Sequence, residues 1–188
     1  YKVPDLAINE RRILSVDIAL MASKKKKNND ASSIMINSCI PTGNNNYISN
    51  IVYAENHEGL TTDELGLIVM RLYYSMKCTD IAIDTNGVGL GVYDFIIKDQ
   101  LDPDTGETFN ALSCCNNKDM EERCKVKNAP KVVWSIKANQ SFNNEMCTML
   151  RAGFKNGKIN LLVSEFEAEE ILRDKIKGFS RLSIYEQT

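Results

Sequence analysis

Short apolar runs separated by polar turns make up the first part of the chain. Residues 12–20 form a run rich in β-branched side chains with one aspartate near its middle, and residues 33–40 and 47–54 have a similar character. Runs of this length and composition, bounded by turn residues, favour buried strands over helices. Because only a turn-rich linker separates the second run from the third, we expect these strands to pair directly. The pattern therefore predicts an antiparallel meander of three strands.

A helical period begins after residue 60. Thr61 and Glu64 have the spacing of a capping box, in which each side chain bonds the backbone of the other residue. Apolar residues then recur every three or four positions, at Leu65, Ile68, Val69, Leu72 and Met76. This spacing places them on one face and predicts an amphipathic helix.

Strands and helices alternate through the rest of the chain. Strands are expected at residues 81–84, 132–136 and 159–163. Helices are expected at about 92–100, after a cap at Ser141, and at about 164–177. The polar, turn-rich residues 101–130 are interpreted as an insertion and not as a second domain. The order predicts a single α/β domain over residues 1–188, with a mixed β-sheet (antiparallel meander plus parallel strands) flanked by helices.

Charge and cysteine content narrow the classes of function. The 188 residues carry 23 basic and 25 acidic side chains, a net charge of −2, so bulk positive charge does not hold nucleic acid here. This net charge is compatible with a site that acts on nucleic acid once a partner delivers it. The six cysteines include no C-x-x-C pair and the single histidine is His57, which argues against a zinc site and against Ser–His or Cys–His catalysis. No apolar run approaches the ~20 residues that a membrane-spanning helix needs.

Two aspartates interrupt or end apolar strands. Asp17 lies inside the run at residues 12–20, and Asp84 ends the run at residues 81–84. Burying an unpaired carboxylate costs several kcal/mol or more, so a basic partner, backbone donors or a metal ion has to compensate. If the two strand ends converge, both carboxylates share one site, where a divalent cation would remove their repulsion. The alternative stays open that each aspartate is structural and that Asp84 only caps the turn after its strand.

Other motifs give weaker signals. The glycine-rich residues 87–91 do not complete a dinucleotide-binding fingerprint, because the third glycine would fall at Val92. We interpret these glycines instead as positions that allow a helix to start close to the sheet beside Asp84. No P-loop surrounds Gly157-Lys158, so the sequence supports no ATPase. The four lysines at 24–27 are a solvated loop or, alternatively, a phosphate-contacting loop.

The order and spacing of these segments resemble a known family. The segments are ILSVDIA at 13–19, the meander, the amphipathic helix, IAIDTNGVG at 81–89, VVWSI at 132–136 and the stretch 154–172, which together cover most of the chain. They resemble the nuclease domain of the large terminase subunit of tailed bacteriophages. The resemblance implies a ribonuclease-H-like fold and a metal-dependent endonuclease that cuts concatemeric double-stranded viral DNA during packaging.

The resemblance also implies the site. Asp17 and Asp84 match the first two catalytic carboxylates, which bind Mg²⁺ or Mn²⁺ for two-metal phosphodiester hydrolysis, with Asp17 bridging both ions and Asp84 holding one. Asp30 matches a less regular acidic position near the metals. The family's third essential aspartate lies on a helix near the C-terminus of the domain; Asp174 comes too early to match it, so we expect that acid beyond Thr188.

The implied partners are double-stranded DNA, an upstream ATPase domain of the same polypeptide, the portal and the small terminase subunit, without a membrane. The implied location is the cytoplasm of an infected or prophage-carrying bacterium. Two alternatives remain: another ribonuclease-H-like nuclease, such as a recombinase or junction resolvase, and a non-catalytic interaction domain in which both aspartates are structural.

Overall fold

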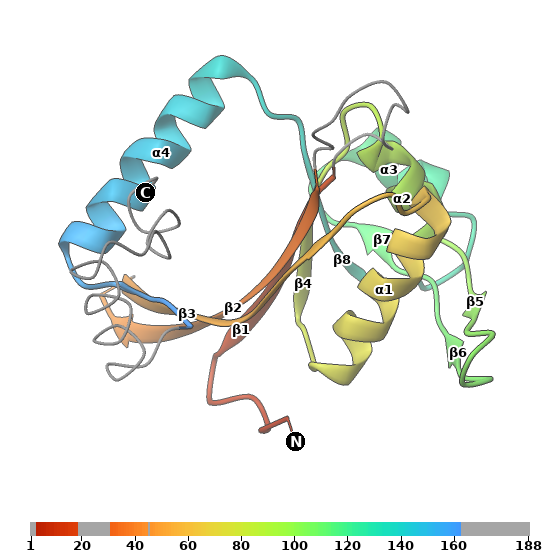
Figure 1. The fold of residues 1–188 in the computed structure, drawn as a ribbon, viewed down its shortest axis with the longest axis horizontal. Helices are drawn as coiled ribbons and strands as arrows, with labels where there is room; N and C mark the ends of the chain where they lie inside the picture. Colours follow the sequence, from red (N-terminus) through yellow and green to blue (C-terminus); the bar gives the residue numbers. More distant parts are fainter. Residues whose placement is uncertain (1–2, 19–30, 45, 163–188) are drawn as a thin grey trace, which may run out of the picture.

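The computed structural model describes residues 3–18, 31–44 and 46–162. Within these residues the chain forms one large sheet, a small hairpin and four helices (Figure 1). The strands of the large sheet are β1 (Arg11–Asp17), β2 (Ser32–Gly43), β3 (Asn46–His57), β4 (Asp80–Asp84), β7 (Ser113–Cys114), β8 (Lys131–Ile136) and β9 (Ile159–Asn160). The hairpin comprises β5 (Gln100–Leu101) and β6 (Thr108–Phe109). The helices are α1 (Thr62–Ser75), α2 (Gly89–Ile96), α3 (Lys118–Arg123) and α4 (Gln140–Lys155).

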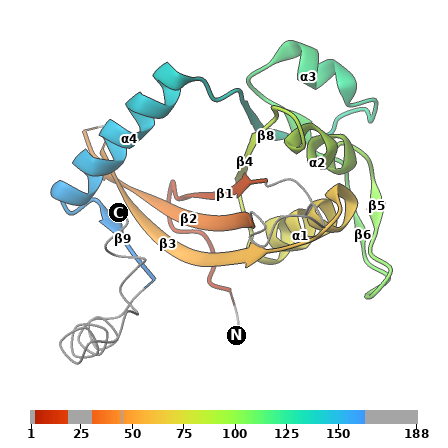
Figure 2. The same ribbon diagram turned by 45° about the horizontal axis from the view of Figure 1, so that its top comes forward.

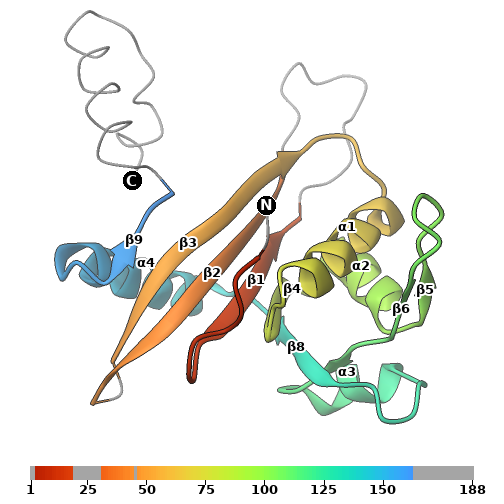
Figure 3. The same ribbon diagram turned by 90° about the horizontal axis from the view of Figure 1, so that it is seen from below.

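The large sheet is mixed, as the sequence predicts. Its strand order is β7-β8-β4-β1-β2-β3-β9, and Figure 3 shows the run from β3 to β8 side by side. β1, β2 and β3 form the antiparallel meander, whereas β4 runs parallel to β1 and β8 runs parallel to β4. The carboxyl ends of β1, β4 and β8 therefore lie at the same edge of the sheet.

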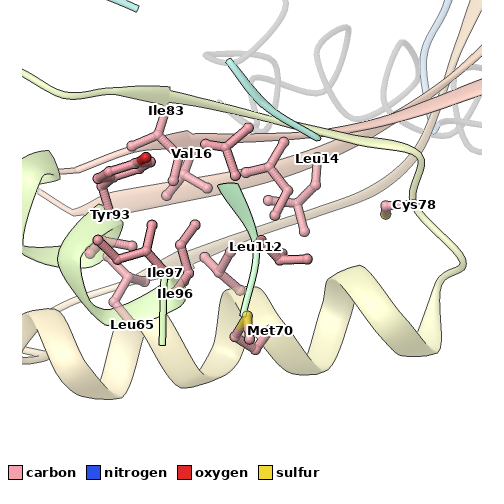
Figure 4. Close-up of a cluster of buried hydrophobic side chains, with 14 of the residues drawn as sticks. Leu14, Val16, Leu65, Met70, Cys78, Ile83, Tyr93, Ile96, Ile97 and Leu112 are labelled. Carbon is pink, nitrogen blue, oxygen red and sulfur yellow. The ribbon is translucent and has the colours of Figure 1, made fainter. Parts of the chain in front are cut away.

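Helices α1 and α2 cover one face of this sheet and close the hydrophobic core. The Thr61 hydroxyl accepts a hydrogen bond from the Glu64 backbone N–H at 3.2 Å, and the Glu64 carboxylate accepts one from the Thr61 backbone N–H at 2.8 Å, so the capping box is confirmed. Figure 4 shows core side chains that come from β1, β4, α1 and α2, among them Leu14, Val16, Leu65, Ile83, Tyr93 and Ile96.

Residues 101–130 attach to this core although their composition is polar. β7 adds a strand to the sheet beside β8, and Leu112, Cys114 and Met120 are buried. The Tyr93 hydroxyl donates a hydrogen bond to the Met120 carbonyl oxygen at 2.6 Å. These apolar residues are scattered between turns without a helical or strand period, so the sequence pattern gives no signal for their burial.

Helix α4 lies on the opposite side of the sheet from α1 and α2, and none of its residues is buried (Figures 1 and 2). Its N-cap is Asn139, whose side chain accepts a hydrogen bond from the Phe142 backbone N–H at 2.9 Å. The predicted cap at Ser141 is therefore wrong by two positions, because asparagine caps a helix as well as serine does. Of the predicted strand at 159–163, only Ile159–Asn160 forms a strand, β9; residue 163 and the predicted helix at 164–177 lie outside the described residues.

Candidate functional site

The two aspartates singled out in the sequence end neighbouring parallel strands. β1 and β4 pair in a register that sets Val16 beside Ile83, and Asp17 and Asp84 are the next residue on each strand. Adjacent strands lie about 4.8 Å apart. The parallel pairing therefore brings both residues to the same edge of the sheet, although 67 positions separate them in the sequence.

Alternation along the strands decides which face these carboxylates occupy. Leu14 and Val16 on β1 and Ile83 on β4 are buried in the core beneath α1 and α2. Successive strand residues point to opposite faces of a sheet, so Asp17 and Asp84 lie on the face that these helices leave uncovered. A pocket of about 370 Å³ opens there. Its lining includes Ser15, Asp17, Ser33, Met35, Ala82 and Asp84.

Asp17 is exposed to solvent, and this corrects the sequence analysis. The apolar run suggested a carboxylate inside a buried strand, but β1 ends at Asp17 and the side chain is open to water. No burial cost therefore requires a metal ion at this position. What remains as an argument for a shared site is the convergence of two carboxylates in one pocket.

Asp84 is half-buried and has one local partner. Its Oδ1 atom accepts a hydrogen bond from the Asn86 backbone N–H at 2.9 Å, which is the turn-capping contact of the structural alternative. Among the described residues, neither Asp84 nor Asp17 forms an ion pair with a basic side chain. Two acids that share a pocket with no cationic side chain among the described residues could bind an external cation.

The start of α2 lies directly against the backbone of Asp84. A Cβ atom at Gly89 would stand 1.8 Å from the Asp84 carbonyl oxygen, so only glycine permits this approach. Gly87 has φ 59°, a left-handed conformation that glycine adopts without strain. The prediction that the glycines allow a helix to start close to the sheet is confirmed.

A set of polar side chains that the sequence analysis missed fixes the end of β4 against β8. The Thr85 and Ser135 hydroxyls are hydrogen-bonded at 2.7 Å, and both residues are buried. The Asn116 side chain accepts from the Ser135 backbone N–H at 2.9 Å and donates to the Ser135 carbonyl oxygen at 3.0 Å. The position of Thr85 directly after Asp84 could have identified it from the sequence. No sequence pattern identifies Asn116, because its hydrogen bonds are to a strand distant in the chain.

Among the described residues, the pocket contains two of the predicted acidic positions, Asp17 and Asp84. Within the described ranges, no group of three or more His, Cys, Asp or Glu side chains is arranged to hold a metal ion, so the pocket offers two carboxylates. Asp30, Asp174 and the lysines at 24–27 lie outside the described residues. The helices in the described part of the chain include none long and apolar enough to cross a membrane.

A search with models of protein families finds no match to this chain, and a search of curated protein sequences finds no similar protein.

Proposed function

We propose that this chain is a metal-dependent DNA endonuclease domain of the terminase type, which cuts concatemeric double-stranded viral DNA during packaging. The observation that carries the proposal is the position of Asp17 and Asp84 at the ends of adjacent parallel strands, in one open pocket. The strand order β3-β2-β1-β4-β8 is compatible with the ribonuclease-H-like fold that the sequence resemblance implies.

The oxygen atoms of the pocket suit Mg²⁺ or Mn²⁺. Both ions prefer carboxylate oxygens, and Mg²⁺ is commonly held by one or two carboxylates together with substrate phosphate oxygens. Asp17 and Asp84 would hold the ion. In such sites a bound divalent ion supplies an activated water and neutralises charge on the phosphate. Without a cation the two carboxylates repel each other, so the pair does not stabilise the fold by itself. A bound cation would remove this repulsion.

The residues around the carboxylates fit a phosphodiester substrate. As far as the described residues show, the pocket opens to solvent and is accessible to a DNA backbone, and Ser33 lies opposite Asp17 in the β1–β2 register. Its hydroxyl can donate a hydrogen bond to a phosphate oxygen. A net charge of −2 gives little intrinsic affinity for DNA. In the proposed setting, the ATPase domain, portal and small terminase subunit deliver the DNA in the bacterial cytoplasm.

The test is cleavage of supercoiled plasmid by the intact polypeptide with Mn²⁺ or Mg²⁺. We expect Asp17→Asn and Asp84→Asn each to abolish cleavage, because each removes one charged ligand. In chelator, each variant should melt at the wild-type temperature or slightly above it, because the repulsion between the carboxylates falls. At position 84 the asparagine keeps an oxygen that can accept from the Asn86 backbone N–H.

The matched control is Glu58→Gln, which removes the same charge from an exposed position outside the pocket lining and should leave cleavage unchanged. Cleavage that survives Asp17→Asn, or a wild-type polypeptide that cuts no DNA with either ion, would contradict the proposal. A variant that melts several degrees lower in chelator would assign that aspartate to the structural alternative. Preference for branched over linear duplex would place the enzyme with the junction resolvases.

A further inference from the structure

An exposed tryptophan stands on the same open face as the two aspartates. Trp134, the only tryptophan of the chain, lies in the middle of β8. Its neighbours Val133 and Ser135 are buried on the helix-covered side, so Trp134 points to the opposite face, where it is 37% exposed. Tryptophan is rarely fully buried, so the exposure alone carries no argument; what distinguishes Trp134 is how its ring is held.

A polar cluster holds the ring in one orientation. The indole Nε1–H donates to Asp80 Oδ1 at 2.8 Å, and the Arg11 guanidinium lies over the ring, with Cζ 5.7 Å from the centroid. Arg11 also pairs with Asp80, and the Thr79 hydroxyl donates to Asp80 Oδ2 at 2.7 Å. Burial alone would raise the pKa of Asp80, but these hydrogen bonds outweigh it and hold the pKa below its ordinary value. The carboxylate that orients the ring is therefore ionised at neutral pH.

The sheet register places this ring beside the aspartate pocket. In the β4–β8 register, Trp134 lies beside Ala82, and Ile136 lies beside Asp84. Measured along the strands, the ring is therefore two residues away from the Asp84 carboxylate. Two strand residues span about 7 Å. Ala82 and Ile136, the strand partners of Trp134 and Asp84, both line the pocket, so the ring adjoins the pocket wall. One nucleotide of a DNA strand can bridge such a distance.

The charge of the cluster indicates what kind of contact the ring makes. Asp80 neutralises the charge of Arg11, so the cluster offers little net charge to a phosphate. Because Arg11 lies over one side of the ring, the exposed part of the indole is the oriented π-surface on which any nucleobase can stack. On the basis of the proposed nuclease function, we propose that Trp134 is a stacking platform for an unpaired nucleobase of the strand whose phosphate reaches Asp17 and Asp84.

Because Trp134 is the only tryptophan of the 188 residues, tryptophan fluorescence of this chain reports on the platform directly. The 188-residue chain is titrated in chelator with a short single-stranded oligodeoxynucleotide, and with a blunt duplex of the same sequence. We expect saturable quenching by the single strand, weak quenching by the duplex, and a shallow dependence on salt, since few phosphate charges are neutralised. Iodide should quench the free protein and be excluded from the complex.

Variants separate stacking from folding. Trp134→Ala should weaken binding of a labelled single strand, measured by anisotropy, about 5- to 150-fold, the range for loss of one stacked base, whereas Trp134→Phe should keep most of it. The control Tyr47→Ala removes another exposed aromatic ring, which lies on β3 and outside the pocket lining. Thermal unfolding of each variant establishes that it is folded.

The outcomes distinguish this platform from the nuclease proposal. Binding is measured without divalent ions and cleavage with them, and Glu58→Gln, outside the pocket lining, should bind the single strand as wild type does. A protein that stacks DNA but cuts none would therefore contradict only the nuclease proposal. Unchanged affinity in Trp134→Ala, unchanged emission when the strand binds, or a ring that iodide cannot reach in the free protein would overturn the platform, whatever the cleavage result.

Discussion

Asp17 and Asp84 differ in surroundings although they occupy equivalent strand ends. Asp17 is exposed, whereas Asp84 is half-buried and accepts a hydrogen bond from the turn that follows it. The start of α2 and the Thr85–Ser135 contact surround Asp84 on its backbone side. We infer that Asp84 is the positioned member of the pair, since its backbone is held from two directions.

At the residue scale, we predict that Gly89→Ala destabilises the protein by about 1–3 kcal/mol, the usual cost of overpacking a tight contact. The added Cβ would stand 1.8 Å from the Asp84 carbonyl oxygen, so α2 or the end of β4 has to shift. Chemical denaturation measures the loss, and cleavage should fall with it because Asp84 moves.

Gly91→Ala is the matched control on the same helix. There the new Cβ would meet the Thr62 side chain at 2.9 Å, and a side chain can give way more readily than a backbone carbonyl. Alanine also has the higher helix propensity, so the net change should be small. Equal losses in the two variants would contradict the assigned role of Gly89.

At the scale of elements, an ion pair ties the β5–β6 hairpin region to α1. Arg71 on α1 donates to Asp102 through Nε at 2.6 Å and through Nη2 at 2.5 Å, and it also bonds Asp104. Asp102 is 1% exposed and accepts a further hydrogen bond from the Asp104 backbone N–H at 2.9 Å. The contact fastens residues 101–130 to the helix that covers the core.

This pair predicts a dependence of stability on pH. Hydrogen bonds from Arg71 hold the pKa of Asp102 well below its ordinary value of 3.8. A carboxyl whose pKa is lower in the folded state stabilises the fold above the unfolded pKa, and this contribution is lost as the pH falls towards the folded pKa. We therefore expect the free energy of unfolding to fall from pH 5 to pH 2.

Asp102→Asn should lower stability at pH 7 and flatten this dependence below about pH 4, because the variant no longer takes up that proton on unfolding. Urea unfolding at several pH values measures both effects. The control Glu58→Gln should keep the wild-type pH dependence. If Asp102→Asn lost stability on acidification as steeply as wild type does, other carboxyl groups would account for the whole effect.

At the scale of the molecule, the sheet has one face covered by α1 and α2 and another that carries the aspartate pocket and Trp134. The two described pocket carboxylates should bind divalent ions weakly, at about the millimolar level, because Mg²⁺ keeps its waters unless enough ligands compete. With ~10 mM ion and a dissociation constant of ~1 mM, binding stabilises the fold by only about 1.4 kcal/mol. A small thermal shift is expected, larger with Mn²⁺ than with Mg²⁺.

A third carboxylate should strengthen this site. Ser33 lies opposite Asp17 in the β1–β2 register and lines the pocket, so Ser33→Asp adds an acid beside the pair. We expect a lower melting temperature in chelator, because repulsion grows. With Mn²⁺ the shift should be larger than in wild type: a tenfold gain in affinity raises the stabilisation at ~10 mM ion to about 2.7 kcal/mol.

Asn37→Asp is the control for this prediction. It adds the same charge four residues away on the same face of β2, outside the pocket lining. The aspartate keeps an oxygen that can accept the hydrogen bond from the Ser49 hydroxyl. Its Mn²⁺ shift should equal that of wild type. If Ser33→Asp responded to Mn²⁺ no more than this control, the pocket would not be a cation site.

The local pattern of the sequence determined the elements of the fold. The meander, the capped helix α1 and the strands β4 and β8 follow from apolar period, turn residues and a capping box, all of which act between residues close in sequence. The same pattern singled out Asp17 and Asp84, because a charge in an apolar run is visible without any structure. It also identified the glycines at the start of α2.

Only the tertiary structure decided how these parts are used. The register of β1 against β4 sets both aspartates in one pocket, and the end of β1 leaves Asp17 in solvent and not in the core. The burial of Leu112, and the contacts of Trp134 with Arg11 and Asp80, join residues far apart in the chain. Such contacts depend on strand pairing and on which face each side chain takes, and a one-residue change of register would reverse that face. A local sequence pattern does not contain that information.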